Sequence, residues 1–119
     1  MAKILLIEDD LSLSKILSKE LESRGHEVIL STDGKSALKK ISENFDLILL
    51  DIMLPDVSGI EILKKIKSMK ENQDVPVIVL TNLADQLTIS KILNAGGKDY
   101  FVKSDWPVND LVDKITAKI

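Results

Sequence analysis

The run Leu-Ile-Leu-Leu at residues 47–50, followed at once by Asp51, is the feature that most constrains the fold. Four consecutive apolar residues are typical of a strand buried on both faces, because a strand with one face in water would alternate apolar and polar side chains. Pro55 then predicts a loop soon after the strand. Open α/β sheets bind ligands at the carboxyl ends of their strands, so Asp51 is a candidate site residue.

Other short apolar segments alternate with segments of helical spacing along the whole chain. We expect strands at residues 3–7, 28–30, 47–50, 75–80 and 99–102, the fourth with Pro76 near its beginning. The predicted helices carry apolar residues three or four positions apart. In chain order these are Leu13, Ile16, Leu17 and Leu21; Ala37, Leu38 and Ile41; Ile62, Leu63, Ile66 and Met69; Ile89, Ile92 and Leu93; and Leu111, Val112, Ile115 and Ile119.

The ends of these helices also have recognisable signals. Gly25 is suited to ending the first helix, since glycine tolerates a left-handed backbone. Ser58 and Glu61 have the spacing of a capping box at the start of the third helix. Asp85 is a candidate cap for the fourth helix, and Pro107 suits the first turn of the fifth.

Five strands alternating with five helices predict an α/β fold with a doubly wound parallel sheet and helices on both faces. Five strands favour the flavodoxin-like order 2-1-3-4-5, in which the direction of winding reverses between strands 1 and 3. The ligand crevice should open at the carboxyl ends of those two strands. A chain of 119 residues is long enough for one such domain, spanning residues 1–119.

Acidic residues follow both strands that flank the predicted crevice: Glu8 and Asp9 follow the first, and Asp51 ends the third. Carboxylates brought together raise one another's pKa, so a divalent cation would offset their charge. Mg²⁺ suits an all-oxygen site, whereas the absence of cysteine and the distant position of His26 disfavour Zn²⁺. The alternative is that these acids cap the first helix, which we expect of Asp10.

Two more polar residues follow strands at the same predicted edge, Thr81 after the fourth strand and Lys103 after the fifth. Taken alone, Thr81 would be interpreted as a cap at the end of a strand, and Lys103 as a lysine in solvent. Together with a cation, the ammonium group and the hydroxyl would cradle a phosphoryl group. Asp51 would then be the nucleophile and form an acyl phosphate.

Four segments resemble the receiver domain of bacterial two-component response regulators, the CheY-like family. They are KILLIEDD at 3–10, LILLDIMLPDVSG at 47–59, VIVLTN at 77–82 and GGKDYFVK at 96–103, so the resemblance covers essentially the whole chain. It implies a phosphorylation-dependent signalling switch in which Asp51 is the phosphoacceptor. The phosphoryl group would come from a histidine kinase or a histidine phosphotransfer protein.

The resemblance also implies the roles of the other site residues. Asp9 would bind Mg²⁺ directly, Glu8 would act through water, and the backbone carbonyl of Met53 would complete the ligands. Thr81 and Lys103 would contact the phosphoryl group. Tyr100 would swing inward as Thr81 moves, which alters the face formed by helix 4, strand 5 and helix 5. The alternative is that Tyr100 is a half-exposed strand aromatic that never switches.

Three positions depart from the family pattern. Ser104 follows Lys103 where the family has a proline in a cis peptide, so we expect a trans bond and a rearranged loop. Asn82 stands where the family favours a small residue, and it would narrow phosphoryl access or hold a water. Met53 has no side-chain group that could orient an attacking water, so we expect slow self-dephosphorylation. Trp106 is expected to be a packing residue.

Composition limits the other classes of function. The chain is 45% hydrophobic and 29% charged with a net charge of -3, and no basic patch or reading motif suggests nucleic-acid binding. No apolar run has the roughly 18 residues of a membrane span, and no signal peptide precedes the first strand, so we expect a cytoplasmic protein. The sequence stops after the fifth helix, so we expect no effector domain, in either a stand-alone receiver or one cut from a larger protein.

Three competing functions remain at this stage. A flavodoxin-like carrier of FMN or nucleotide would need a phosphate loop after the first strand, where acidic residues repel phosphate instead. A small Mg²⁺-dependent phosphatase would need a second acid beside Asp51 and a cap over the substrate. A degenerate receiver would signal without phosphate. The expected protein is not a conventional enzyme, since it assists only its own phosphorylation and dephosphorylation.

Overall fold

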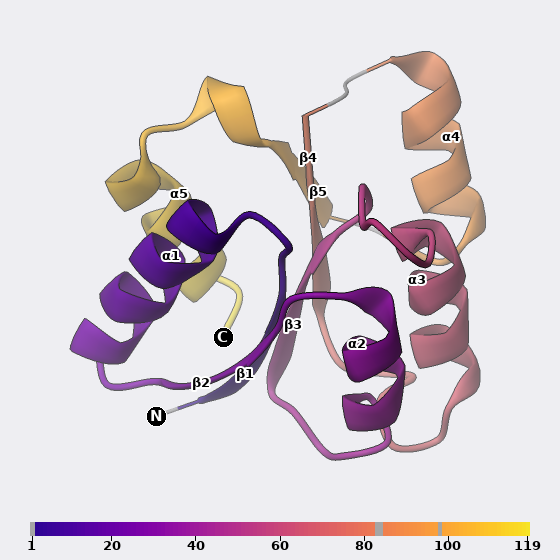
Figure 1. Cartoon of the computed structure of the whole chain (residues 1–119), viewed down its shortest axis with the longest axis horizontal. Helices are drawn as coiled ribbons and strands as arrows, with labels where there is room; N and C mark the ends of the chain where they lie inside the picture. Colours follow the sequence, from indigo (N-terminus) through magenta and orange to yellow (C-terminus); the bar gives the residue numbers. More distant parts are fainter. Residues whose placement is uncertain (1, 83–84, 98) are drawn as a thin grey trace.

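The computed structural model describes residues 2–82, 85–97 and 99–119, and strands alternate with helices throughout them (Figure 1). A single turn of 3-10 helix at Lys103–Asp105 connects the last strand to the last helix. The strands are β1 (Lys3–Ile7), β2 (Glu27–Ser31), β3 (Leu47–Asp51), β4 (Val77–Thr81) and β5 (Asp99–Val102). The helices are α1 (Leu11–Ser23), α2 (Gly34–Lys40), α3 (Gly59–Ser68), α4 (Gln86–Asn94) and α5 (Val108–Thr116).

The five strands form one parallel sheet in the order β2-β1-β3-β4-β5, which confirms the predicted topology. The chain winds outward from β1 to β2 and then crosses to β3 on the other side of β1. The winding therefore reverses between β1 and β3, and Ile7 at the end of β1 lies beside Leu50 of β3. This is the position at which sheets of this class open a ligand crevice.

Helices cover both faces of the sheet, with α1 and α5 on one side and α2, α3 and α4 on the other (Figure 1). Successive residues of a strand point to opposite faces, so Ile4 and Leu6 pack toward α1 and α5 while Leu5 and Ile7 pack toward α2–α4. All residues of β3 are buried. The run at residues 47–50 is uninterrupted because both faces of this strand are dry.

The predicted helix caps are confirmed at three starts. The carboxylate of Asp10 accepts the N–H of Leu13 at 3.1 Å, and that of Asp85 accepts the N–H of Thr88 at 2.7 Å. The hydroxyl of Ser58 accepts the N–H of Ile60 at 3.2 Å, so Ser58 caps α3, while the carboxylate of Glu61 pairs with Lys64 instead of completing a capping box. Some boundaries differ from the prediction: β2 extends one residue beyond each end of 28–30, β4 begins only after Pro76, and Pro107 precedes α5 as its N-cap.

Four of the predicted buried helix residues are instead exposed, with 39% to 54% of their surface accessible. A helix on a flat sheet buries only a stripe about 100° wide, so apolar residues at the margins of the stripe stay in water. Leu93 is next to the fully buried Ile92 and is turned by about 100° from it along α4. The exposed residues are Ile16, Leu38 and Leu93 within their helices, and Ile119, which lies beyond the end of α5 at Thr116.

Trp106 packs against Phe101 of β5 and Lys114 of α5, as expected of a packing residue. Its ring meets Phe101 edge to face with centroids 6.1 Å apart, and the ammonium of Lys114 lies 5.3 Å from its centroid. Trp106 is partly buried against the cluster beneath α1 and α5.

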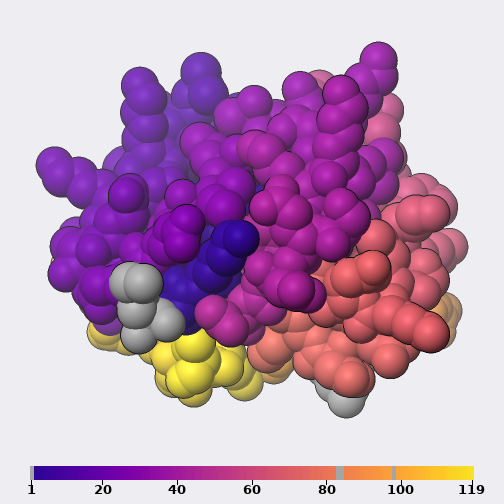
Figure 2. Space-filling view, turned by 90° about the horizontal axis from the view of Figure 1, so that it is seen from below, coloured from indigo at the N-terminus to yellow at the C-terminus, as the bar shows by residue number. Residues whose placement is uncertain are grey.

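The amino edge of the sheet is closed by polar contacts between loops. Asn72 is 1% exposed, and its side-chain amide donates to the carbonyls of Ile41 and Glu43. These bonds tie the connection that precedes β4 to the one that precedes β3. Figure 2 shows this end of the molecule, where the first residues of β1 (indigo) lie beside the end of the chain (yellow).

Candidate functional site

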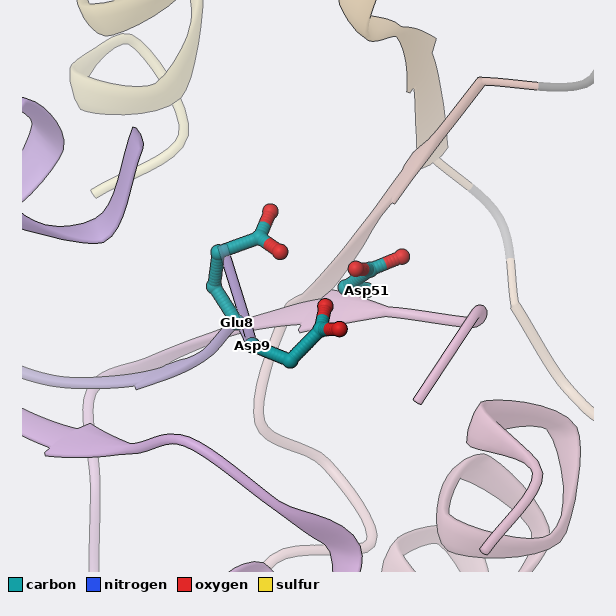
Figure 3. Close-up of side chains that lie close together, drawn as sticks. All are labelled: Glu8, Asp9 and Asp51. Atoms are coloured by element: carbon teal, nitrogen blue, oxygen red, sulfur yellow. The ribbon is translucent and has the colours of Figure 1, made fainter. Parts of the chain in front are cut away.

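Three carboxylates meet at the carboxyl edge of the sheet, where β1 and β3 end side by side (Figure 3). Glu8 and Asp9 follow the last residue of β1, and Asp51 is the last residue of β3. One oxygen from each of the three lies within 4.8 Å of the other two. The structure thus brings together the acidic residues that the sequence placed in one crevice.

Glu8 is fully buried, which is unusual for a carboxylate. Its Oε2 accepts the N–H of Asp10 at 3.2 Å, and its Oε1 lies 2.5 Å from the ammonium of Lys103. Burial, together with the adjacent Asp51, raises the pKa of Glu8 to about 8, because these two effects outweigh the lowering by Lys103. The pocket is therefore short of positive charge.

Asp51 is 2% exposed and has a partner on each carboxylate oxygen. Oδ1 accepts the N–H of Met53 at 2.9 Å, and Oδ2 lies 3.2 Å from Lys103 Nζ. Burial alone would lower the pKa of Lys103, but the Glu8 and Asp51 carboxylates outweigh it and raise that pKa. Lys103 is thus a fixed cation that faces both buried acids.

Asp9 is the accessible member of the group. It is exposed and lines a hollow of about 400 Å³ formed with the β3–α3 loop, residues 52–58. A cation held by Asp9 would therefore keep part of its shell in water. Asp10, by contrast, caps α1, as expected.

The donor set fits a hard divalent cation. The group of three carboxylates supplies only oxygen, and Mg²⁺ prefers such ligands while retaining several waters. The only ion pairs to these acids in the described ranges come from one lysine, which leaves net negative charge in a buried pocket. His26 lies at the opposite edge, where its Nδ1 accepts the N–H of Ala2 at 3.1 Å. The site thus offers none of the nitrogen or sulfur ligands that zinc favours.

Thr81 and Tyr100 lie on β4 and β5, the two strands that follow β3 on one side of the sheet. Thr81 is fully buried at the end of β4 and lies beside Val102 of β5. Tyr100 is level with Val79, two residues upstream on β4, and is partly buried against the core beneath α2–α4. The hydroxyl residue and the aromatic residue are therefore on adjacent strands, with Tyr100 set back from the edge.

The peptide bond between Lys103 and Ser104 is trans, as expected. The described residues contain no cis peptide bond, and Lys103, Ser104 and Asp105 form the single 3-10 turn. Asn82 is exposed just after β4. Met53 is 57% exposed, so its side chain points away from the buried acids while its N–H holds Asp51.

Sequence reasoning assigned no role to Asp56. Its carboxylate accepts three backbone N–H groups, from Gly34 at 2.7 Å, Lys35 at 3.0 Å and Val57 at 2.9 Å. The bond from Gly34 is the largest cause of the lowered pKa of Asp56. An aspartate after a loop proline is too common a pattern to reveal a partner 22 residues earlier in the chain.

Together, this sheet order and this pocket define a class: a doubly wound α/β protein with an acidic, lysine-bearing site at the point where the winding reverses. The chain matches the response regulator receiver domain family over residues 4–116. It belongs to that family.

Curated relatives agree with the match. The chain is 38% identical over 120 residues to response regulator ArlR of Staphylococcus saprophyticus, covering 100% of this chain and 53% of ArlR. It is 40% identical over 119 residues to the transcriptional regulatory protein CpxR of Escherichia coli K12, covering 98% of this chain and 49% of CpxR. The chain spans about half the length of the curated relatives it matches.

Solved structures are similar along the whole chain. A CheY-like receiver domain protein from Methanospirillum hungatei superposes with a TM-score of 0.89 at 33% identity, covering 99% of this chain and 93% of that one. Response regulator TrrA of Thermotoga maritima, solved in complex with Mg²⁺ and a beryllium fluoride, has a TM-score of 0.84 at 32% identity, covering 100% of both chains. Within the described residues, no helix is both long enough and apolar enough to span a bilayer.

Proposed function

We propose that residues 1–119 act as one phosphorylation-dependent switch, in which Asp51 accepts a phosphoryl group from a histidine kinase or a histidine phosphotransfer protein. The observation that carries the proposal is the contact geometry of Asp51. It is a buried carboxylate at the end of β3, 3.2 Å from Lys103 Nζ and grouped with Glu8 and Asp9. Such a group is a nucleophile held beside the cation that its product requires.

The chemistry is a direct transfer. A carboxylate oxygen of Asp51 attacks the phosphorus of the phosphohistidine, the P–N bond breaks, and the departing nitrogen keeps the electron pair. The product is an acyl phosphate with about -1.5 to -2 added charge and three acceptor oxygens. Lys103 offsets that charge as a point cation, and the Thr81 hydroxyl donates a hydrogen bond to the phosphoryl group. This transfer regulates the protein itself and is not conventional enzyme turnover.

Mg²⁺ is the proposed cofactor. Asp9, Asp51 and the Met53 carbonyl would bind it directly, and Glu8 would bind through water. Bound Mg²⁺ supplies charge neutralisation for the incoming phosphoryl oxygens. The all-oxygen donor set supports this choice, as does the Mg²⁺ complex of the similar TrrA protein.

The proposed readout runs from Thr81 to Tyr100. Thr81 moves toward the phosphoryl group, Tyr100 packs further inward from its partly buried position, and the α4–β5–α5 face changes shape for a downstream protein. We propose that this happens in the cytoplasm, with protein partners and without direct binding of nucleic acid or membrane. The net charge of -3 supports that choice of partners.

The test is intact-mass measurement after incubation with Mg²⁺ and acetyl phosphate, in which acetate is the leaving group. The wild-type chain should gain one phosphate, and Asp51→Asn should gain none. Asp85→Asn is the matched control, because Asp85 is an exposed helix cap on another loop, and it should keep the gain. A folded wild-type chain that gains nothing from any donor would support a receiver that signals without phosphate.

A further inference from the structure

The β3–α3 loop that carries Met53 is held against the start of α2. Asp56, in this loop, accepts the N–H groups of Gly34 and Lys35, the first two residues of α2. Its remaining short contact is with the N–H of Val57 beside it. Both oxygens of Asp56 are therefore occupied by backbone donors, and this carboxylate serves as a link between two segments.

The backbones at the same junction are closely packed, with no room for a side chain at Gly34. A Cβ added at Gly34 would lie 2.6 Å from the Cβ of Val57 and 3.0 Å from the Asp56 carboxylate. At the far end of the loop, a Cβ on Gly59 would lie 2.3 Å from the Cα of Ile52. Glycine at both places lets the loop lie directly on the backbone of its neighbours.

The β2–α2 corner supports the other arm of the acidic pocket as well. The N–H of Glu8 donates to the carbonyl of Ser31 at 3.0 Å, and the hydroxyls of Ser31 and Ser36 are 3.1 Å apart. Ser31 is 1% exposed. One corner of the fold thus holds Glu8 through Ser31 and the Met53 loop through Asp56.

We propose that Asp56 is a positioning residue for the metal site: by fixing the β3–α3 loop to the start of α2, it sets the place of the Met53 carbonyl relative to Asp9 and Asp51. The inference rests on the proposed function. Only one bond from the loop to the acids is observed, from the Met53 N–H to Asp51. Without the Asp56 carboxylate, the loop would lose its hydrogen bonds to the start of α2 and would keep the packing of Val57 against Gly34.

The lowered pKa of Asp56 agrees with this role, since the bonds from Gly34 and the other N–H groups stabilise the ionised form. An asparagine at position 56 has only one acceptor oxygen, and it is uncharged. It could accept the N–H of Gly34 or of Lys35, whereas the two carboxylate oxygens of Asp56 accept one each. Asp56→Ala should therefore have a larger effect than Asp56→Asn.

The experiment measures Mn²⁺ binding, as a substitute for Mg²⁺, by the loss of the free-ion EPR signal, without any phosphodonor. Asp56→Ala should weaken binding about 10-fold, the lower end of the range for groups that orient metal ligands. The matched control is Asp33→Ala, because Asp33 caps the same helix and its carboxylate accepts the Ser36 N–H at 2.7 Å, a bond within α2 and not to the loop. Both variants should lower the melting temperature, and only the Asp56 variant should lose Mn²⁺ affinity.

Three outcomes would overturn the inference. Asp56→Ala with wild-type affinity would show that the link does not place the ligands. Equal losses in Asp33→Ala and Asp56→Ala would assign the effect to the stability of α2 in general. If wild type itself does not bind Mn²⁺, the proposed metal site fails as well, which separates that result from the first two. If Asp56→Ala does not fold, Asp56→Asn decides the same comparison.

Discussion

Glu8 and Asp56 are both acids at the carboxyl edge of one sheet, and their surroundings shift their pKa values in opposite directions. Glu8 is fully buried, faces Asp51 and has its pKa raised to about 8. Asp56 is exposed, accepts three backbone N–H groups and has its pKa lowered. The first acid needs a cation, and the second is already satisfied by the chain.

The difference teaches how to separate a binding site from a structural cap. Both residues are carboxylic acids that follow a strand, but within the described residues they differ in the number of backbone N–H groups that donate to them: three to Asp56 and one to Glu8. Backbone N–H groups stabilise a carboxylate where it is, whereas a second carboxylate and a dry environment leave it dependent on an added charge. Clusters such as Glu8, Asp9 and Asp51 become candidate metal sites because their hydrogen bonds do not balance their charge.

The largest expected effect concerns the stability of the metal-free protein against pH. The pKa of Glu8 is 4.5 in the unfolded reference and about 8 in the folded chain, so the folded state binds a proton that the unfolded state releases. The contribution of Glu8 to stability should be fully present below pH 4.5 and should be lost as pH rises to about 8, an amount on the order of several kcal/mol. Urea unfolding in EDTA across this range measures it.

Glu8→Gln is the variant that isolates the contribution of Glu8 to the pH dependence of stability. It should remove most of the decline, because the glutamine stays neutral in both states. Mg²⁺ should reduce the wild-type decline instead, since a ligand at 100 times its Kd stabilises by about 2.7 kcal/mol. An unchanged slope in Glu8→Gln would mean that Glu8 is not the acid that opposes folding.

A smaller effect of opposite sign is expected at Asp56. Because its folded pKa lies below the reference value of 3.8, its contribution is present above pH 3.8 and is lost as pH falls through the folded pKa. Asp56→Asn should therefore be less stable than wild type at pH 7, with the gap closing in acid. Thermal unfolding of both proteins from pH 7 down to pH 2.5 tests this, and a gap that widens in acid would refute the contrast with Glu8.

The smallest effect is expected at Met53, which lies between the two regions along the chain. Its side chain is 57% exposed and has no group to orient a water toward the acyl phosphate. Met53→Asn should speed the loss of phosphate by a few-fold. Intact mass, recorded at intervals after the phosphodonor is removed, measures the decay, and Met53→Leu is the control. Decay that is unchanged or slower in the asparagine variant would contradict the explanation.

The fold and the acidic pocket could be predicted from sequence because each depends on signals that are local in the chain. Strand β3 is a continuous apolar run, and Asp51 directly ends it. Once parallel order is assumed, the ends of neighbouring strands meet without further information. The pairing of Glu8 with Asp51 across β1 and β3 followed in this way.

The link from Asp56 to α2 could not be predicted, because it joins a loop to a helix start 22 residues away. The exposure of Leu93 also escaped the periodic pattern, which gives the apolar side of a helix but not how much of it the sheet covers. Both features depend on the docking of elements, and that docking is set by packing of the whole core.

The buried amide of Asn72 has a consequence for where motion can occur. By holding the carbonyls of Ile41 and Glu43, it joins the connections at the amino edge of the sheet, the edge opposite the acids. We expect the backbone amides held at this junction to open less readily than those in the loops beside the site. In a hydrogen-exchange comparison of the phosphorylated and free chains, the segment around Asn72 would serve as the internal standard against which changes in the β4–α4 and β5–α5 loops are measured.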